Sequence, residues 1–390
     1  MKHIFSFFIN MLILCTTIFG QYIPAIQNQE KTPFYLGVTF CGDTTKEAKL
    51  LIDRVRTYSN LFILQSGPIS KNETAVNEIC DYAVAARLNI IVYFGWFDSD
   101  CPWQVPWLDF AKRRWGDRFL GIYYYDEPGG VYLDYNWSQL FNKMKQQNST
   151  TYQTVAPVLE SYLNGTLPRD YDEAANRFIS SIQNNPGLNE LKSRSITTFT
   201  SDYALYWFDY IGGYDVVLAE FGWNNSIVQE IALVRGAAQV QNKSWGAIIT
   251  WKYNEPPYLD SGDIVYEQMR VAYEAGAEYV VIFNYPQIKD NPYGAMLDEH
   301  FEAIERLWNE AKTPKPLQES VTAENILVLP RNYGWGMRRP DDRIWYWGPD
   351  EETLQIWELT RKLLSQYDLE LDIIYEDKEF PITNQYTQVF

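Results

Sequence analysis

Short apolar runs alternate with amphipathic stretches along most of the chain. Eight of these runs are almost continuously apolar and rich in β-branched and aromatic residues, which is typical of strands that are covered on both faces. We predict strands at residues 34–40, 60–66, 89–97, 119–126, 195–200, 215–223, 245–253 and 279–286. Between them, apolar positions recur with the spacing of a helix at residues 45–58, 73–87, 105–115, 225–241, 264–275 and 297–311.

The alternation of strand and helix predicts an α/β fold, a (β/α)8 TIM barrel over residues 32–313. The alternative is an open doubly wound sheet, but no Gly-x-Gly-x-x-Gly turn follows the first strand. Residues 129–194 are too many for one helix and its loops, so we predict a long insertion after strand 4, with helices near 136–147 and 171–183. An insertion at this point would lie over the upper rim of the barrel, where it could wall a groove.

A second unit follows the barrel. The segment Thr313-Pro-Lys-Pro316 has the composition of a linker, and residues 320–390 predict a small α/β C-terminal domain. Its predicted elements are a strand at 325–329, a loop at 331–349, a helix at 351–366 and a strand at 369–375. About 70 residues give only a marginal core, so we expect this appendage to pack on the barrel.

The N-terminus predicts export. Lys2 and His3 precede an apolar run that ends at Gly20, which is the layout of a secretory signal peptide over residues 1–20. An uncleaved membrane anchor is the alternative, but the run is short for a spanning helix of about 20 residues. We therefore expect an extracellular or cell-surface protein with no membrane span in the mature chain.

Sequons and cysteines agree with export. Asn-x-Ser/Thr triplets that could carry N-glycans begin at Asn72, Asn136, Asn148, Asn164, Asn224 and Asn242. Cys41, Cys80 and Cys101 remain after cleavage, and an oxidising compartment allows one disulfide. Cys41 and Cys101 both follow predicted strands at one end of the barrel, which makes them the preferred pair. Reduced, buried cysteines are the alternative.

Charge and composition exclude several classes of partner. The net charge of −17 repels phosphate backbones, so nucleic acid is a poor partner. His3 and His300 are the only histidines, which argues against a His-rich metal site, and we expect no cofactor and no catalytic metal. A structural Ca²⁺ site at Asp98 and Asp100 stays open. Aromatic residues make up 16% of the chain, and part of this content is available to line a groove for a carbohydrate.

Polar and aromatic side chains follow the predicted strands at one end. In a TIM barrel, the active residues lie at the carboxyl ends of the strands. We predict carbohydrate binding by the residues that gather there, which are Asp43, Trp96, Asp98, Asp126, Trp223, Trp251, Tyr253, Asn284 and Tyr285. Core packing is the alternative interpretation for the three tryptophans.

The strongest signal is the segment GIYYYDEPG at residues 121–129. Two carboxylates at the end of an apolar strand lower stability when they are buried, so a purely structural role does not readily explain them. Neighbouring side chains of a strand point to opposite faces, so we expect only one of Asp126 and Glu127 to point into the mouth of the barrel. Glu127 is the candidate acid/base, because aromatic surroundings raise the pKa of a carboxylic acid toward the range of a proton donor. A structural cap, or an ion pair with Arg113 or Arg114, is the alternative.

Two further glutamates are candidates for a second catalytic carboxylate. Glu220 ends the predicted sixth strand, and Glu255 follows the predicted seventh. Cleavage of a glycosidic bond requires one proton donor and one nucleophile or base, and their spacing decides between retention and inversion. A buried structural role for Glu220 and a solvated loop position for Glu255 are the alternatives.

The fourth predicted strand carries a family resemblance. Its end resembles the Gly-x-x-x-x-Asp-Glu-Pro signature of several barrel glycoside hydrolases, and it is similar to the Asn-Glu-Pro of clan A glycosidases. The resemblance implies that Glu127 is the acid/base and that Glu255, near the end of the seventh strand, is the nucleophile. Glu220 departs from that pattern. The strand also resembles that of the chitinase family in part, but Tyr123 and Tyr125 replace its aspartates, which argues against N-acetyl-assisted cleavage.

The leading hypothesis is therefore a secreted glycoside hydrolase that cleaves a polysaccharide or glycan. The alternative is a non-catalytic carbohydrate-binding or cell-surface protein on the same barrel, because a fold does not imply a chemistry. A metal-dependent hydrolase is a third class, and the scarcity of histidine argues against it.

Overall fold

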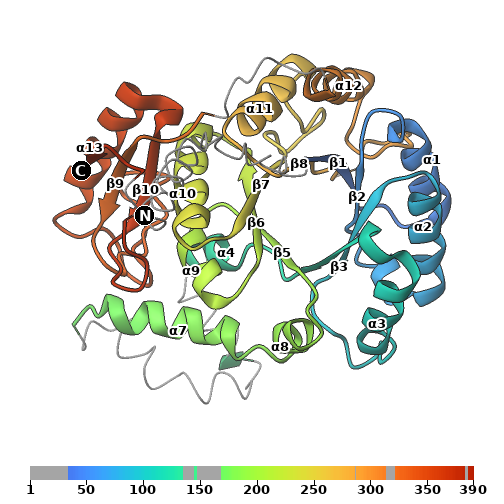
Figure 1. The fold of residues 1–390 in the computed structure, drawn as a ribbon, viewed down its shortest axis with the longest axis horizontal. Coiled ribbons are helices and arrows are strands. Elements are labelled where there is room, and N and C mark those ends of the chain that lie inside the picture. Colours follow the sequence, from blue (N-terminus) through green and yellow to red (C-terminus); the bar gives the residue numbers. More distant parts are fainter. Residues whose placement is uncertain (1–33, 135–144, 147–167, 286, 313–320, 383–384) are drawn as a thin grey trace, which may run out of the picture. The chain divides into compact units, whose positions relative to one another are not determined.

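The protein is built on a closed barrel of parallel strands. The structure is a computed structural model that describes residues 34–134, 145–146, 168–285, 287–312, 321–382 and 385–390. Each strand pairs with the next along the chain, and β8 pairs with β1 to close the barrel (Figure 1). The prediction of a (β/α)8 TIM barrel is thereby confirmed. The predicted signal peptide and linker lie outside the described residues.

The barrel strands are shorter than the apolar runs that predict them. They are β1 (Tyr35–Phe40), β2 (Leu61–Leu64), β3 (Asn89–Phe94), β4 (Phe119–Tyr124), β5 (Thr198–Asp202), β6 (Val216–Phe221), β7 (Ser244–Ile249) and β8 (Tyr279–Ile282). Most end early at the carboxyl side, where the chain turns out of the ladder; Tyr125, for example, has a left-handed φ of 63°. The fifth strand is displaced from its predicted position at 195–200, because Ser195 still belongs to the preceding turn (φ 52°) while Asp202 still pairs with β6.

Helices cover the outside of the barrel. They are α1 (Thr45–Val55), α2 (Glu73–Ala85), α3 (Gln104–Trp115), α4 (Pro128–Asp134), α7 (Tyr171–Gln183), α8 (Pro186–Ser193), α9 (Tyr206–Gly212), α10 (Ile227–Val240), α11 (Gly262–Glu274) and α12 (Asp298–Lys312). Single 3-10 turns lie at Ile69–Lys71, Gly116–Arg118 and Asp368–Glu370. The helix predicted at 171–183 is present, whereas most of the one predicted near 136–147 lies outside the described residues. No helix in the described part of the chain is long and apolar enough to cross a membrane.

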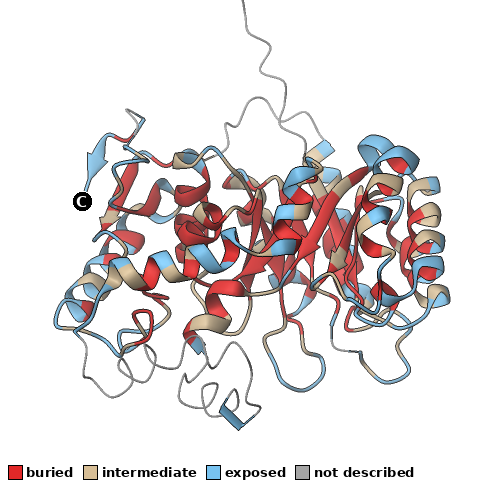
Figure 2. Cartoon of the chain, turned by 90° about the horizontal axis from the view of Figure 1, so that it is seen from below, coloured by how far each residue is buried: buried red, intermediate tan, exposed pale blue. Residues whose placement is uncertain are grey.

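The core has an inner and an outer layer. Figure 2 shows the strands almost wholly buried and the helices exposed only on their outer faces. Inward-pointing side chains fill the barrel itself, and they are Leu61, Ile63, Ile91, Tyr123, Phe199, Val216, Leu218, Ile248, Tyr279 and Val281. Tyr123 is completely buried in this layer, and its hydroxyl faces the carboxyl end of the barrel, where it meets Asp126. The packed interior therefore forms the floor of whatever site the rim contains.

The predicted disulfide is wrong, because Cys41, Cys80 and Cys101 are all free in the structure. The Cys41 thiol contacts the Thr39 hydroxyl, and the Cys101 thiol faces the carbonyl of Lys71 instead. Burial raises the pKa of the Cys41 thiol to about 12, so this thiol stays protonated and unreactive near neutral pH.

A small second sheet follows the barrel. Its strands are β9 (Asn325–Leu329), β10 (Leu371–Tyr375) and β11 (Gln388–Val389), in the order β10-β9-β11, and α13 (Thr353–Tyr367) connects the first two. The strand and helix pattern of this region predicted β9, α13 and β10, but the two-residue β11 is too short for any pattern to reveal. As expected, the region packs on the barrel, with β10 against α10.

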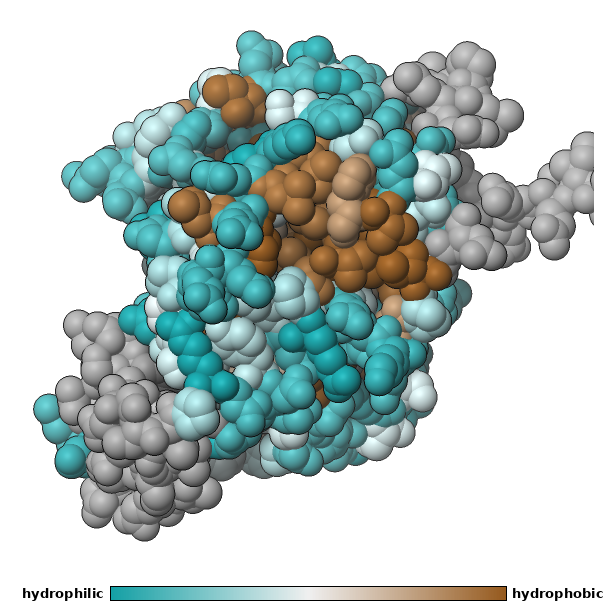
Figure 3. All heavy atoms as spheres, turned by 90° about the vertical axis from the view of Figure 1, so that its left-hand side faces the viewer, coloured by the Kyte–Doolittle hydropathy of each residue, from teal (hydrophilic) through white to brown (hydrophobic). Residues whose placement is uncertain are grey.

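The C-terminal region also carries exposed apolar side chains. Figure 3 views the molecule from the side on which the C-terminal region lies in Figure 1, and it shows an apolar area bordered by hydrophilic residues. The large apolar side chains of the region that are exposed are Leu354, Leu359, Ile382, Val389 and Phe390. The described part of the chain leaves them partly uncovered.

A buried ion pair joins the barrel to the second sheet. Arg235 of α10 donates through Nε to Asp372 of β10 at 2.8 Å, and the Asp372 side chain is fully buried. The same guanidinium donates to the carbonyls of Leu369 and Leu371, and Tyr386 donates its hydroxyl to the other Asp372 oxygen. Every polar atom of this junction that faces the core therefore has a partner, which is the condition under which a buried ion pair is tolerated.

We expect Arg235→Met to destabilise the protein by about 3 kcal/mol or more, because it leaves a buried carboxylate without its cation. Urea denaturation measures the loss. The control is Arg56→Met, which removes an ion pair at the surface, where the Arg56 guanidinium lies 3.6 Å from Asp53. It should lower the free energy of unfolding by less than about 1 kcal/mol. The double variant Arg235→Met/Asp372→Leu should recover much of the loss, and equal losses in the single and double variants would contradict this account.

Candidate active site

A pocket opens at the carboxyl end of the barrel. It holds about 300 Å³ of space, part of it open to solvent. The residues that line it come from six strand ends and are Gln65, Asp126, Glu127, Ser201, Glu220, Trp223, Ile248, Thr250, Trp251 and Phe283. Three carboxyl groups and two indole rings thus share one small cavity, and two of the carboxyl groups belong to the predicted catalytic residues Glu127 and Glu220.

Both Asp126 and Glu127 reach this pocket, so the expectation that only one would do so is wrong. That expectation assumed strand geometry, but β4 ends at Tyr124. Tyr125 and Glu127 have left-handed φ angles of 63° and 50°, which residues other than glycine rarely adopt. Strained backbone of this kind is held in place by its surroundings and is frequent at functional sites.

Main-chain hydrogen bonds hold Glu127 in that conformation. Its N–H donates to the carbonyl of Ser201 on β5 at 3.0 Å. Its own carbonyl accepts from the N–H of Val131 at 3.1 Å, which makes Glu127 the residue on which α4 starts. The neighbouring strand and the following helix therefore both fix the direction of the Glu127 side chain.

Asp202 of β5 caps the start of α4. Its carboxylate accepts the N–H groups of Gly129 (2.5 Å) and Gly130 (2.7 Å), and also those of Tyr203 and Ala204. This close approach explains the paired glycines. A Cβ on Gly129 would lie 2.5 Å from the carbonyl oxygen of Ala204, and one on Gly130 would lie 2.2 Å from the Tyr203 ring.

A hydrogen-bond network links two of the pocket carboxylates, Asp126 and Glu220, through Ser201. The Ser201 hydroxyl lies 2.5 Å from Glu220 Oε1 and 3.3 Å from Asp126 Oδ1. The Tyr123 hydroxyl contacts Asp126 and lies 2.7 Å from the Ser201 oxygen. Two hydroxyl protons thus serve two carboxylates at the floor of the pocket, which orients Asp126 and Glu220 without any cation.

Glu127 and Glu220 meet carboxyl to carboxyl. The two groups lie within hydrogen-bonding reach of each other, so the two carboxyls can share one proton. Burial, followed by the charges of Asp126 and Asp202, raises the pKa of Glu127 to about 7. The pKa of Glu220 is raised well above its ordinary value, first by complete burial and then by the charge of Glu127. Near neutral pH the pair therefore shares a proton between an acid and a conjugate base.

A second carboxyl pair lies beneath α4. Asp209 of α9 is completely buried, and its carboxyl has no hydrogen-bond partner in the described residues other than Asp202. Burial raises the pKa of Asp209 well above its ordinary value, and the charge of Asp202 raises it further, so Asp209 is protonated and donates to Asp202. Burial also raises the pKa of Asp202 to about 7, although four backbone N–H groups oppose the shift.

Aromatic rings form one wall of the pocket. Trp223, with a left-handed φ of 47°, meets the Tyr203 ring edge-on at 5.7 Å. Trp251 packs on Tyr285 at 5.4 Å, and Tyr285 is 46% exposed. These rings offer flat apolar faces beside the carboxylates, as a sugar-binding site requires.

A second hollow adjoins the mouth at the ends of β1 and β8. It holds about 580 Å³ and is lined by Phe40, Cys41, Gly42, Asp43, Glu47, Leu51, Asn284, Tyr285, Gln287, Pro292, Tyr293 and Gly294. Three of the predicted binding residues, Asp43, Asn284 and Tyr285, therefore lie there and not beside Glu127. The Asn284 amide oxygen already accepts the N–H groups of Ala295 and Met296, so this side chain braces the wall of the hollow.

Other predicted site residues lie away from both hollows. Glu255 is exposed on the loop after β7, where its carbonyl accepts from Tyr258, and it does not line the pocket of Glu127. Tyr253 is exposed on the same loop and donates to Asp260. Trp96 is 61% exposed after β3.

Asp98 pairs with Lys71 at 3.2 Å and accepts the N–H of Asp100, and both contacts lower the pKa of its carboxyl. Among the described residues, no group of three or more His, Cys, Asp or Glu side chains is placed to hold a metal ion. His300 is buried between the N–H of Leu297 and the carbonyl of Asp260, which is a structural position.

Several polar residues in or beside the pocket were not among the predicted site residues. Gln65, Ser201 and Thr250 line the pocket, Tyr123 bonds to Asp126 from below, and Asp202 caps the adjoining helix α4. Ser201 and Asp202 escaped notice because the fifth strand was predicted to end before them. Gln65 is 8% exposed and its amide oxygen has no partner in the described part of the chain, so it is an acceptor available at the edge of the pocket.

The fold of this chain has counterparts among solved structures. No family model matches the chain, and no curated protein matches it. GH5_18 from Streptomyces cattleya, solved in complex with GlcNAc, matches with a TM-score of 0.54 at 9% identity, over 92% of this chain and 98% of that chain. Weaker matches include an endo-β-1,4-mannanase from Thermotoga petrophila (TM-score 0.42, 9% identity, 77% and 83% covered) and β-glucosidase 1317 (TM-score 0.40, 11% identity, 71% and 90% covered).

The chain has the TIM-barrel fold that glycoside hydrolases share. Identity this low shows the fold alone, and the two weaker matches add nothing to the first. The match to GH5_18 covers 92% of this chain, which is a larger share than the barrel residues alone make up, so the likeness extends into the C-terminal region.

We expect the free energy of unfolding to fall as the pH rises from about 5 to about 8. The pKa values of Glu127 and Asp202 are about 7, and that of Glu230 is about 8, all far above those of the unfolded chain near 4. In this window the folded protein holds protons that the unfolded chain has released, so each pH step favours unfolding. Urea denaturation at pH 5.5 and pH 8 measures the difference.

Glu127→Gln should flatten part of this dependence, because an amide needs no proton. We expect the stability of the variant relative to the wild type to increase by roughly 2 kcal/mol between pH 5.5 and pH 8. Glu255→Gln, at an exposed position, is the matched control and should leave the slope unchanged. Parallel slopes for the wild type and Glu127→Gln would show that Glu127 does not hold an extra proton.

Proposed function

We propose that this protein is an exported glycoside hydrolase that cleaves a polysaccharide or glycan. The observation that carries the proposal is the contact between the Glu127 and Glu220 carboxyls in a pocket walled by tryptophans. Two carboxyl groups, one protonated and one ionised, are the complement that hydrolysis of a glycosidic bond requires. The shared fold supports the proposal, since GH5_18 from Streptomyces cattleya was solved with a sugar bound.

In the proposed reaction, Glu127 donates its proton to the leaving oxygen. A pKa of about 7 lets this carboxyl carry the proton at neutral pH and still release it readily. For this step the proton that the pair shares passes to Glu127, which leaves Glu220 ionised. Glu220 then supplies the negative charge at the reacting carbon, and the Ser201 hydroxyl bonded to Oε1 stabilises that charge. Glu127 then takes a proton from the incoming water and regains its starting form.

The contact between the carboxyls also favours a stereochemical outcome. Retaining enzymes place their carboxyls about 5 Å apart, and inverting enzymes leave roughly 6.5 Å or more for a water molecule. Glu127 and Glu220 lie within hydrogen-bonding reach of each other in the free pocket, which is closer to the spacing of retaining enzymes than to that of inverting ones. We therefore propose retention, through a covalent intermediate on Glu220.

The charge of the pocket bears on the substrate. Asp126, Glu127 and Glu220 line it, and none of the described lining residues is basic. An acidic sugar would bring a further negative charge into a buried acidic cavity, whereas hydroxyl groups find acceptors there, including the free amide oxygen of Gln65. We propose that the reacting sugar is uncharged or cationic.

Export and glycosylation belong to the proposal as well. The predicted signal peptide directs the chain outside the cell, and Asn72, Asn224 and Asn242 are exposed, as acceptors of N-glycans must be. The other three sequons lie outside the described residues.

Glu127→Gln and Glu220→Gln should each lower kcat for a cleaved glycan by about 10²- to 10⁴-fold, because the first removes the proton donor and the second removes the nucleophile. Reducing-sugar release from a panel of polysaccharides measures the activity, and proton NMR of the first product reports its anomer. Glu255→Gln should keep wild-type activity. An inactive Glu255→Gln together with an active Glu220→Gln would instead support the clan A arrangement. Binding of glycan without turnover in the wild type would support the non-catalytic alternative.

Substrate charge gives an independent test. We expect neutral aryl glycosides to be cleaved at least about tenfold faster than the matching glycuronides, because the glycuronide carboxylate repels the pocket acids. The control is a glycuronide methyl ester, which has nearly the same shape without the charge. Equal rates for the acid and its ester would overturn the argument from charge.

A further inference from the structure

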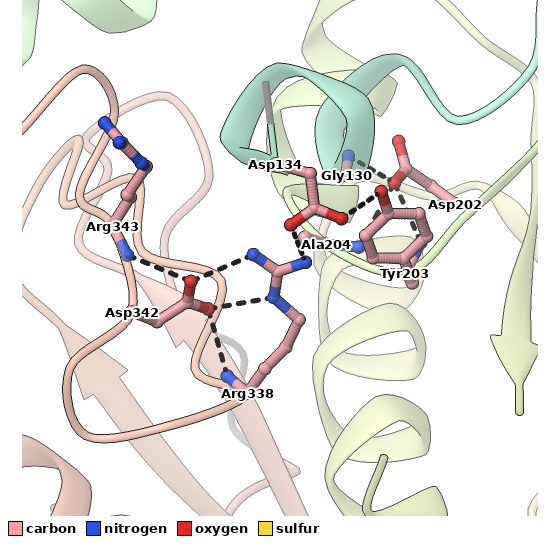
Figure 4. A network of polar contacts seen from close by, with 8 residues as sticks. All are labelled: Gly130, Asp134, Asp202, Tyr203, Ala204, Arg338, Asp342 and Arg343. Atoms are coloured by element: carbon pink, nitrogen blue, oxygen red, sulfur yellow. Dashed lines mark hydrogen bonds and ion pairs between the residues drawn. The ribbon is translucent and has the colours of Figure 1, made fainter. Parts of the chain in front are cut away.

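An arginine of the C-terminal region reaches the wall of the candidate pocket. Arg338 lies in the loop 331–349, and its side chain is only 12% exposed. Its guanidinium donates to Asp342 of the same loop twice, each time at 2.9 Å, and to Asp134 at the end of α4 at 2.6 Å (Figure 4). One nearly buried cation therefore ties this loop to the helix that follows Glu127.

Tyr203 continues the connection toward the pocket. Its hydroxyl donates to the second oxygen of Asp134 at 2.8 Å, and its backbone N–H donates to Asp202 at 2.8 Å, as Figure 4 shows. Arg338 lies over the Tyr203 ring at 5.3 Å, and the edge of that ring meets Trp223 at 5.7 Å. Arg338 thus acts on two parts of the site, namely the helix that starts at Glu127 and the tryptophan in the pocket wall.

We propose that the loop 331–349 is part of the active-site scaffold and that Arg338 is a positioning residue, which holds Glu127 and Trp223 in place through Asp134 and Tyr203. This inference rests on the proposed function of Glu127. It gives the C-terminal region a direct role in the reaction, because a TIM barrel normally builds its site from its own loops. The neighbouring Arg339 is exposed and has no such contact with the described residues, so we assign the effect to one arginine of the pair.

The charge of Asp134 offers a readout that a purely structural contact would not move. The charged and titratable groups that act on Glu127 are Asp126 at the end of β4, Asp202 on β5, Glu220 on β6 and Asp134 on α4. Each of the three aspartates raises the pKa of Glu127, and Asp134 is the only one outside the pocket and its cap. Removing its charge should therefore lower the pKa of Glu127 while leaving the pocket intact.

The experiment compares Asp134→Asn, Tyr203→Phe, Arg338→Met and Arg338→Lys in the full chain, with Arg339→Met as the matched control. Asp134→Asn should shift the alkaline limb of the pH–rate profile down by a few tenths of a pH unit, because it removes a negative charge near Glu127. Arg338→Met should lower kcat roughly tenfold or more with little change in KM, and Arg338→Lys should restore part of it. Arg339→Met should match the wild type in both measurements.

Tyr203→Phe keeps the ring on Trp223 and removes only the bond to Asp134, so it reports on the helix path even if Arg338→Met folds poorly. A normal kcat in both Tyr203→Phe and Arg338→Met, or an unmoved pH profile in Asp134→Asn, would overturn the inference.

A stability cycle separates this inference from the proposed function. Urea midpoints at pH 5.5 and pH 8 for Asp134→Asn, Glu127→Gln and the double variant require no enzymatic activity. The inference expects Asp134→Asn to change the pH dependence only when Glu127 is present. If the wild type cleaves no glycan but this coupling is found, the proposed function fails and the scaffold stands. If the effects of Asp134→Asn and Glu127→Gln on the pH dependence are additive, the role of Asp134 in the scaffold is rejected, and the proposed function is unaffected.

Discussion

The mouth of this barrel depends on one buried carboxylate that accepts four backbone N–H groups. Asp202 accepts the backbone N–H groups of two glycines at the start of α4 and of the two residues that follow the end of β5. Hydrogen bonds from N–H groups to an ionised acceptor are stronger than neutral ones, and they hold the start of α4 against the strand. Because α4 starts on Glu127, the same contacts fix a residue with left-handed backbone. The motif Asp-Glu-Pro-Gly-Gly is thus explained by Asp202, which lies far away in the sequence.

Burying acids at this density carries a cost in stability. Asp202, Asp209, Glu220 and Glu230 of α10 are nearly or completely buried, and Asp126 is partly buried at the pocket. Burial raises the pKa of each of these carboxyls. Each ionisation therefore opposes folding, and the cavity survives because hydroxyls, amides and shared protons satisfy the carboxyls. The apolar layers inside and outside the barrel supply the stability that offsets them. Buried polar groups at a functional site commonly lower the stability of the whole protein, and the surrounding apolar core offsets the loss.

The sequence predicted the scaffold better than the site, for a physical reason. Apolar runs identify strands that are covered on both faces, so all eight barrel strands could be located. Strand ends are set instead by turns and by pairing with neighbours, and an error of two residues at β5 concealed both Ser201 and Asp202. Side chains alternate along a strand, so those two residues serve opposite faces, one bonding to the pocket carboxylates and the other capping α4. Glu127 could be identified from the sequence because its motif is local. The choice between Glu220 and Glu255 as its partner could not be made, because closure of the barrel decides which strand ends meet.

Barrel geometry accounts for the partner that Glu127 meets. Neighbouring strands lie about 4.8 Å apart, so β4 and β6, separated only by β5, hold their chains roughly 10 Å apart. Two glutamate side chains that lean over β5 can cover this distance and touch, and Ser201 on β5 lies directly beneath them, bonded to Glu220. A glutamate on the loop after β7 starts one strand farther away, and Glu255 is turned toward solvent besides. The position of the second carboxylate two strands from the first, and not three, is therefore what allows one proton to be shared between an acid and a base.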